Sequence, residues 1–306
     1  SIFEQVIKER KPEIALFVSA VNRYGMDSEE LIYLIKAFSK SGTNLSLKNK
    51  FVVDKHSIGG IPGNRTTPLV VSICASAGLI MPKNSSRAIT SPAGTADVIE
   101  TIARVEFSME EVKKIIKKTN ACMIWGGALG VVPADTKIIW VEKSLKIDPK
   151  PMLIASIMSK KLAAGSKYIL IDIPYGKGAK VTKKEALNLK KIFEHLGKYF
   201  KRKIKCVLTD GSQPIGSGIG PALELRDIIK ILDPNQTGPK DLEEKSVFLA
   251  GEIFEMTGIS KKGAGKKLAE DILHSGKAFE KFREIIEAQG GSLRKLRESK
   301  FKRDIM

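Results

Sequence analysis

Apolar residues repeat at helical spacing through the first forty positions of the chain. Residues 3–42 place apolar side chains every three to four positions, stop at Gly25 and resume after the acidic "MDSEE". This pattern predicts short amphipathic helices, with Pro12 near the start of the second. The polar stretch "SGTNLSLKNK" that follows is typical of a linker.

From residue 51 onward, short apolar runs alternate with longer amphipathic stretches. "FVVDK", "KYILIDIPYGKG" and "IKCVLTDG" have the length and composition of strands. Helices are predicted for "TTPLVVSICASAGL", "PMLIASIMSKKLAAG" and "PALELRDIIKIL", after the capping sequences "SMEE" and "TKKE", and over 241–257, 261–274 and 277–288. The alternation predicts an α/β fold around a largely parallel sheet.

The helices at the start, and the one between two glycine-rich joints, do not fit that sheet. We therefore expect a helical lobe formed by residues 1–40 and 134–165, and an α/β lobe formed by residues 51–130 and 167–306. "WGGALGVVPAD" has the composition of a hinge between them.

Composition narrows the classes of partner and cofactor. The chain carries 52 Lys+Arg against 34 Asp+Glu, a net charge of +18, which favours anionic ligands, although a lysine-rich surface explains most of the excess. Cys74, Cys122 and Cys206 lie far apart in apolar surroundings, so we expect reduced core thiols in a cytoplasmic protein and no metal site. No run is long enough to span a membrane, so no membrane partner is expected.

The segment "VDKHSIGGIPGNRTTP" (53–68) is the first candidate site. A strand that ends in Lys55 and Ser57, followed by Gly59 and Gly60 and then by a helix, would expose backbone N–H groups, a cation and a hydroxyl to an anion. An ordinary turn with a surface lysine explains the spacing equally well.

The second candidate is "NSSRAITSPAGTAD" (84–97). It is dense in hydroxyls and contains Arg87, a two-pronged donor suited to phosphate oxygens. The alternative is a polar loop without a ligand.

These two segments resemble a known family. "VDKHSIGG" is similar to the signature of the thymidine and pyrimidine nucleoside phosphorylases, and "NSSRAITSPAGTAD" resembles their archaeal branch, which acts on AMP. The similarity continues through "PAD", "SLKIDP", "ASIMSKKLAAG", "IDIPYGKGAKV", "TDGSQPIGSGIGPALE" and "AQGG". It implies a small α-helical lobe plus a large mixed α/β lobe with a central, largely parallel sheet. Members of this branch carry further N-terminal and C-terminal domains, which we expect this chain to lack.

The resemblance implies an activity, phosphorolysis. Inorganic phosphate would attack C1′ of AMP, and of CMP or UMP as further candidates, to release the base and ribose 1,5-bisphosphate. Phosphate is then a co-substrate, and no cofactor is expected. A homodimer or larger homo-oligomer is expected, without a nucleic-acid partner.

The resemblance also assigns residues. The attacking phosphate would be bound by Lys55, Ser57, Thr67, Ser85 and Thr95. AMP would be bound by Gly60, Ser86, Arg87, Ala88, Ile89, Thr90, Ser91, Thr95, Ser156, Lys160 and Lys180, and Asp148 would be the catalytic proton donor. Taken alone, Asp148 is typical of a helix entry, Ser156 of a serine bonded to its own backbone, and the two lysines of a solvated surface.

Two alternatives stay open at this point. A pyrimidine nucleoside phosphorylase is disfavoured because Ser86, Thr90 and Ser91 replace two glycines and a histidine of that pattern, and Glu142 stands where an arginine reads the base. A non-catalytic RNA-binding protein would explain the charge of +18, but aromatics make up only 6% of the chain and form no stacking motif.

Overall fold

A computed structural model describes residues 11–45, 47, 49, 51–88, 93–130 and 132–295 of the chain. Its strands are β1 (Val53–Ser57), β2 (Met81–Ser85), β3 (Ala121–Trp125), β4 (Tyr168–Tyr175) and β5 (Lys203–Asp210). Its helices are α2 (Lys11–Tyr24), α3 (Ser28–Lys40), α4 (Thr66–Ser76), α5 (Thr95–Glu100), α6 (Met109–Thr119), α7 (Gly126–Leu129), α8 (Pro133–Leu145), α9 (Lys150–Ala163), α10 (Lys183–Tyr199), α11 (Pro221–Leu232), α12 (Lys240–Thr257), α13 (Gly265–His274) and α14 (Lys277–Ala288), followed by the 3-10 turn η1 (Leu293–Lys295).

Every strand pairing among the described residues is parallel. β4 lies between β1 and β5, and β2 pairs with β3. The two sheets meet edge to edge through the isolated bridge between Val52 and Ile80. The predicted α/β class with a largely parallel sheet is confirmed, although the sheet is divided in two.

The sequence patterns did not reveal β2 and β3. β2 reads "MPKNS", and its proline, lysine and asparagine break the apolar run, yet four of its five residues are buried. β3 is only five residues long and follows directly after α6. Strands buried by tertiary packing need not show an apolar pattern, so only the assembled fold identifies them.

Local capping places several helices where the sequence predicts them. Ser108 accepts a hydrogen bond from the backbone N–H of Glu111 at the start of α6, and Thr182 does the same with Glu185 at α10. These hydroxyls satisfy backbone donors that the first helical turn leaves unpaired.

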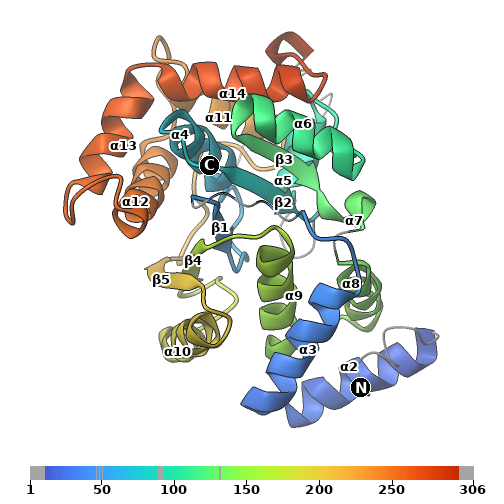
Figure 1. The fold of residues 1–306 in the computed structure, drawn as a ribbon. Coiled ribbons are helices and arrows are strands. Elements are labelled where there is room, and N and C mark those ends of the chain that lie inside the picture. The colour runs from blue at the N-terminus through green and yellow to red at the C-terminus, as the bar shows by residue number, and fades with distance from the viewer. Residues whose placement is uncertain are drawn as a thin grey trace.

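Helices α2, α3, α8 and α9 pack on one another at one end of the molecule (Figure 1). Their apolar side chains form one continuous core with β4, in which Val18 and Phe38 join Ile169 and Ile171. This helical group is therefore anchored on one face of the sheet. The lobe boundaries given by residue number stay a prediction.

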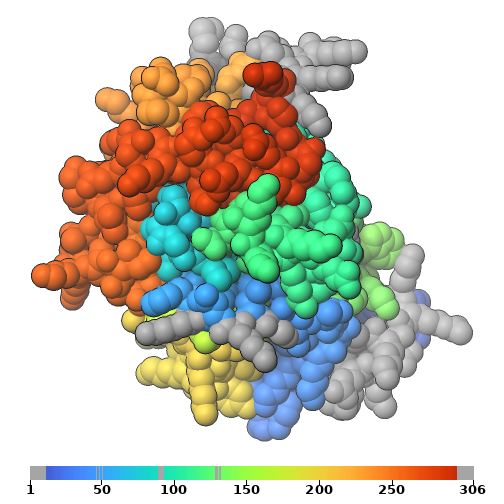
Figure 2. All heavy atoms as spheres, turned by 45° about the horizontal axis from the view of Figure 1, so that its top comes forward, coloured from blue at the N-terminus to red at the C-terminus, as the bar shows by residue number. Residues whose placement is uncertain are grey.

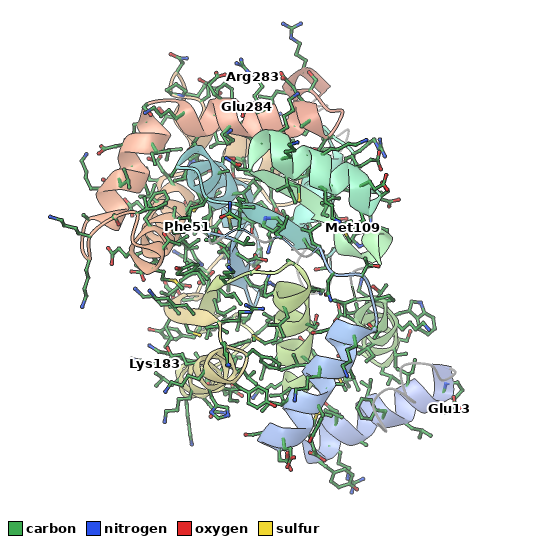
Figure 3. All side chains as sticks on the ribbon, viewed as in Figure 1. Glu13, Phe51, Met109, Lys183, Arg283 and Glu284 are labelled. Carbon is green, nitrogen blue, oxygen red and sulfur yellow. The ribbon has the colours of Figure 1, made fainter. Side chains whose placement is uncertain are left out.

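The opposite face is covered by α4 and by α11 to α14. α14 lies along α4 and α6, as Figures 1 and 2 show. It buries Phe282 and Ile285, whereas Arg283 and Glu284 project outward (Figure 3). Cys74, Cys122 and Cys206 are buried free thiols, as expected. Within the described residues, no helix combines the length and apolarity that crossing a bilayer requires.

Gln289, which follows α14, replaces a strand neighbour at the outer edge of β3. It is fully buried, and its amide accepts from the Met123 N–H at 2.8 Å and donates to the Met123 carbonyl at 3.0 Å and the Arg104 carbonyl at 2.8 Å. One side chain thereby satisfies three backbone groups that the sheet leaves unpaired. This gives the "AQGG" motif a structural role.

We expect Gln289→Ala to lower the free energy of unfolding by about 3 kcal/mol or more, because buried backbone groups lose their partners. Urea denaturation measures the change. Gln236→Ala is the matched control, since its exposed amide donates only to Asp233, and it should change stability by less than about 1 kcal/mol. Equal effects of the two substitutions would contradict this role for Gln289.

Candidate active site

The first candidate turn begins where β1 ends. β1 stops at Ser57, beside Asp172 of β4, and the next residues turn through Gly59 and Gly60 at φ angles of +83° and +96°. Residues other than glycine rarely adopt such backbone angles. A Cβ on Gly60 would also lie 2.9 Å from Lys180 Cγ. The glycine thus allows the backbone to approach Lys180.

The second candidate turn follows β2, and Arg65 ties it to the first. The Arg65 guanidinium donates to the Thr95 hydroxyl at 3.3 Å and to the Ala93 carbonyl at 2.6 Å. Its Nε pairs with Glu224 at 2.6 Å in a buried contact. The structure therefore brings the two turns together, as the sequence analysis requires.

The turns line one cavity of about 160 Å³, which we call the polar cavity. The predicted site residues that line it are Lys55, Ser57, Gly60, Thr67, Ser85, Ser86, Arg87, Thr95, Ser156, Lys160 and Lys180. Lys83, Asn84 and Arg65, which were not predicted, line it as well. Its described lining has six cationic side chains, which are Lys55, Arg65, Lys83, Arg87, Lys160 and Lys180, and no carboxylate. All of them except Lys55 also pair with a carboxylate that does not line the cavity, so the lining offers an anion charged hydrogen-bond donors rather than a large uncompensated charge.

Lys55 lies at the base of the polar cavity. Its side chain is buried, and its ammonium donates to the Thr66 hydroxyl at 2.5 Å. Burial lowers the pKa of Lys55 to about 7; Lys245, Lys83 and Arg65 lower it further, while Asp172 opposes the shift. An anion in the cavity would stabilise the charged form. Burial also lowers the pKa of the neighbouring His56 well below its usual range, so His56 adds no charge.

A buried ionic cluster supports the cavity from beneath. The Asp54 carboxylate pairs with the ammonium groups of Lys161 at 2.7 Å and of Lys83 at 3.4 Å. Lys83 also donates to the Lys55 carbonyl at 2.8 Å. Burial lowers the pKa of Lys161 to about 7, although Asp54 opposes the shift. The cluster fixes Lys83 against β1. The sequence analysis missed it because its members come from β1, β2 and α9.

On the side of the cavity formed by the helical group, two lysines pair with carboxylates. Lys160 lies 2.7 Å from Asp135 and donates to the Ser156 hydroxyl at 3.0 Å. Lys180 lies 2.5 Å from Asp148. Both lysines are largely buried, so neither is the solvated residue that the alternative interpretation supposed.

Asp148 is not among the residues that line the polar cavity, and it reaches the rim through Lys180. Nearby Glu142 has its pKa raised to about 8, mainly by burial and then by Asp148 and Asp135. Glu142, with its raised pKa, and Asp148 therefore lie beside the polar cavity rather than inside it.

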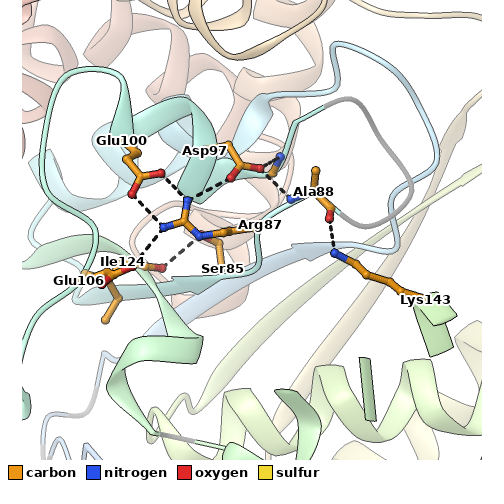
Figure 4. Close-up of polar contacts among 9 residues, drawn as sticks. Ser85, Arg87, Ala88, Asp97, Glu100, Glu106, Ile124 and Lys143 are labelled. Carbon is orange, nitrogen blue, oxygen red and sulfur yellow. Dashed lines mark hydrogen bonds and ion pairs between the residues drawn. The ribbon is translucent and has the colours of Figure 1, made fainter. Parts of the chain in front are cut away.

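Arg87 lies at the rim, and its guanidinium faces carboxylates. It pairs with Glu100 through two nitrogens, with Glu106 at 3.1 Å and with Asp97 at 3.4 Å (Figure 4), and it packs on the Trp125 ring at 4.6 Å. Its charge is thus neutralised in this conformation.

The Ala88 N–H donates to Asp97 at 2.7 Å, and the Ala88 carbonyl accepts from Lys143 at 2.8 Å, which fixes the start of the loop (Figure 4). The predicted contacts Ile89, Thr90 and Ser91 lie outside the described residues.

A second cavity of about 210 Å³ adjoins the first, and we call it the apolar cavity. Trp125, Val132, Ile139 and Trp140 line it, and it shares Asn84, Ser85, Ser86, Arg87 and Lys160 with the polar cavity. Flat apolar walls beside an anion site suit a ligand with both a ring and a phosphate.

Comparison with known proteins identifies the family of the chain. The model of the glycosyl transferase family, a/b domain, matches residues 49–279. The chain belongs to this glycosyl transferase family. The resemblance to AMP phosphorylases is also confirmed: those of Thermococcus kodakarensis and Pyrococcus furiosus are 52% and 50% identical over 285 residues, and that of Methanococcus maripaludis is 47% identical over 298 residues.

The chain spans little more than half the length of those relatives. The alignments cover 93% of the chain and 56% of the Thermococcus and Pyrococcus proteins, and 96% of the chain and 59% of the Methanococcus protein.

Two solved structures share the fold. Anthranilate phosphoribosyltransferase from Thermus thermophilus superposes with a TM-score of 0.77 at 16% identity, covering 95% of this chain and 94% of that one. The enzyme from Saccharomyces cerevisiae, solved with PRPP and Mg, gives 0.70 at 14% identity, with coverage of 92% and 85%. The chain therefore has a phosphoribosyltransferase-like fold, with the mixed α/β architecture that the family resemblance implies.

The protonation of Lys55 predicts how anion affinity depends on pH. Sulfate keeps its charge near neutrality, so its affinity should fall about tenfold per pH unit well above pH 7, as Lys55 loses its proton. Calorimetric titration with sulfate from pH 6 to pH 9 measures this dependence. Lys55→Gln should bind sulfate weakly with a flatter pH profile, and an unchanged slope would rule out Lys55 as the titrating group.

The buried cluster predicts a pH-dependent loss of stability. Asp54→Asn should lower the free energy of unfolding by about 3–5 kcal/mol, because two buried lysines lose their counter-charge. The pKa of Lys161 is about 7 in the folded protein against 10.5 for an ordinary lysine, so the unfolded chain binds more protons between these values and stability rises with pH. Removing the Asp54 carboxylate lowers the pKa of Lys161 in the folded protein further, which extends this pH range downward. The loss of stability should therefore be larger near pH 6 than near pH 9.

Chemical denaturation at both pH values tests this expectation. Asp271→Asn is the control, since Asp271 forms an exposed pair with Lys267, and it should change stability by less than about 1 kcal/mol at either pH. A pH-independent loss in Asp54→Asn would point to lost packing rather than to stranded charge.

Proposed function

We propose that this chain catalyses the phosphorolysis of AMP, giving adenine and ribose 1,5-bisphosphate, with CMP and UMP as further substrates. The observation that carries the proposal is the polar cavity, whose described lining holds six cations and no carboxylate. The reaction brings two phosphate groups into one site, and a lining of this charge suits both. The names of the relatives support the same activity.

The residues suit the nucleophile first. Lys55, Ser57, Thr67, Ser85 and Thr95 all line the polar cavity, where they would hold inorganic phosphate beside the ribose. Holding the attacking oxygen at about 3–3.5 Å from C1′ removes much of the entropic barrier to a two-substrate reaction. The cationic groups of the lining would also offset the charges of the approaching anions.

Gly60, Ser86, Arg87, Ala88 and Thr95 would bind the nucleotide, together with Ile89, Thr90 and Ser91. Ser156 and Lys160 would bind it from α9, and Lys180 from beside Gly60. As a C–O bond forms at C1′, the bond to the base nitrogen breaks and its electron pair leaves with the base. Asp148 would deliver a proton to the leaving base. A nucleotide phosphate that draws Lys180 from Asp148 would free this carboxylate to take up that proton.

No cofactor enters this proposal, since phosphate is the co-substrate. We propose a cytoplasmic location, supported by three buried free thiols, and a homodimer or larger homo-oligomer. Neither a membrane nor a nucleic-acid partner is part of the proposal.

Incubation of the purified chain with AMP and phosphate should release adenine, and omission of phosphate should abolish the release. Asp148→Asn should lower kcat about 10²- to 10⁴-fold, because the leaving base loses its proton donor. Chromatography of the free base measures both outcomes, with Glu194→Gln, in an exposed pair with Lys190, as the control. Phosphate-dependent release from thymidine or uridine but not from AMP would contradict the proposal.

A further inference from the structure

The side-chain carbonyl oxygen of Asn84 is buried and has no hydrogen-bond partner among the described residues. The residue is only 7% exposed, and its carbonyl oxygen, Oδ1, accepts no hydrogen bond from any residue that the structure describes. It lines both the polar and the apolar cavity. An unpaired buried carbonyl destabilises the folded state, so packing alone does not explain an asparagine here.

The surroundings leave room for this amide. Asn84 lies in β2 one residue before Ser85, which pairs with Trp125 at the end of β3. Gly126 follows, and a Cβ at that position would lie 1.9 Å from Asn84 Oδ1. Any other residue at Gly126 would displace the amide. Two neighbouring strand ends thus hold Asn84 between the cavities.

The chemistry of the amide limits which ligand group it contacts. Oδ1 needs a hydrogen-bond donor. The 5′-phosphate dianion of a nucleotide offers only acceptors and inorganic phosphate, as HPO4²⁻, a single O–H, so phosphate is the poorer partner for Oδ1. A hydroxyl both donates and accepts, which matches an amide that carries one acceptor and two donors.

We propose that Asn84 binds the ribose of the nucleotide, with the 2′-hydroxyl donating to Oδ1. The proposal rests on the proposed function, which places C1′ beside the phosphate held by Ser85. C2′ is bonded to C1′, so its hydroxyl comes close to the residue next to Ser85. Asn84 would then distinguish ribonucleotides from 2′-deoxyribonucleotides, since a buried polar group left unpaired penalises the wrong ligand.

The test compares Asn84→Leu with the wild-type protein on AMP and 2′-deoxy-AMP. Leucine keeps the branched shape of asparagine, with methyl groups in place of the oxygen and nitrogen, and removes its hydrogen bonding. Affinity for AMP, measured by calorimetry without phosphate, and kcat/KM for AMP should fall about 10- to 100-fold. Both should change less than about threefold for 2′-deoxy-AMP, because that ligand lacks the donor. The melting temperature should stay equal or rise, since the unpaired amide is gone.

Ser166→Ala is the matched control. Ser166 is also buried, its hydroxyl also lacks a partner among the described residues, and it lines neither cavity. This variant should not alter discrimination between the two nucleotides.

The remaining outcomes separate this inference from the proposed function. Equal losses on both nucleotides would overturn the contact with the 2′-hydroxyl. A loss that persists for 2′-deoxy-AMP but vanishes for IMP, which lacks the amino group, would assign Asn84 to the base and overturn the proposal. If the wild-type protein binds AMP without turnover, the proposed function fails and the binding comparison still decides the role of Asn84. If it does not bind AMP, both fail.

Discussion

The site depends on buried positive charge that the protein only partly neutralises. Lys55, Lys83 and Lys161 are all buried around β1, with Asp54 and Asp172 as nearby carboxylates. Taking an ammonium out of water is unfavourable unless an anion compensates it, and the low pKa of Lys55 expresses that imbalance. A phosphate in the polar cavity would supply the missing charge. The buried positive charge that lowers the stability of the folded protein therefore favours binding of an anionic ligand.

The contacts of Asp54 show why Lys55 is the lysine whose charge is least compensated. Lys161 and Lys83 pair directly with the Asp54 carboxylate, whereas Lys55 has, among the residues that the structure describes, only the Thr66 hydroxyl within hydrogen-bond distance. Lys83 further bonds to the Lys55 carbonyl and thereby couples the cluster to the strand that carries Lys55. Fixed positive groups of this kind need little reorganisation when an anion arrives.

The helical group completes the site from the opposite side. Its apolar residues merge with the face of β4, so α9 is held by the same core as the sheet. Ser156 and Lys160 consequently face the two turns across the polar cavity. Carboxylates on this side, Asp135 and Asp148, pair with Lys160 and Lys180, which line the polar cavity, but do not line it themselves.

Much of the fold could be predicted because its signals are local. The caps at Ser108 and Thr182 act within one helical turn, and the apolar runs of β4 and β5 have the length of strands. β2 could not be predicted, since its proline, lysine and asparagine are buried by neighbours distant in sequence. Gln289 reaches the edge of β3 from 166 residues away, and no local pattern reports such a contact.

The sequence by itself determined the α/β class, the family resemblance and the two hydroxyl-rich and cation-rich turns, because each rests on residue order within a short segment. Only the tertiary structure decided that Arg65 joins those turns, that Arg87 faces Glu100, and that Asp54 lies between two lysines. It alone also left the Asn84 carbonyl without a partner. The physical reason is that charge pairing, burial and unpaired polar atoms depend on distances in space, which neighbouring positions in the chain do not fix.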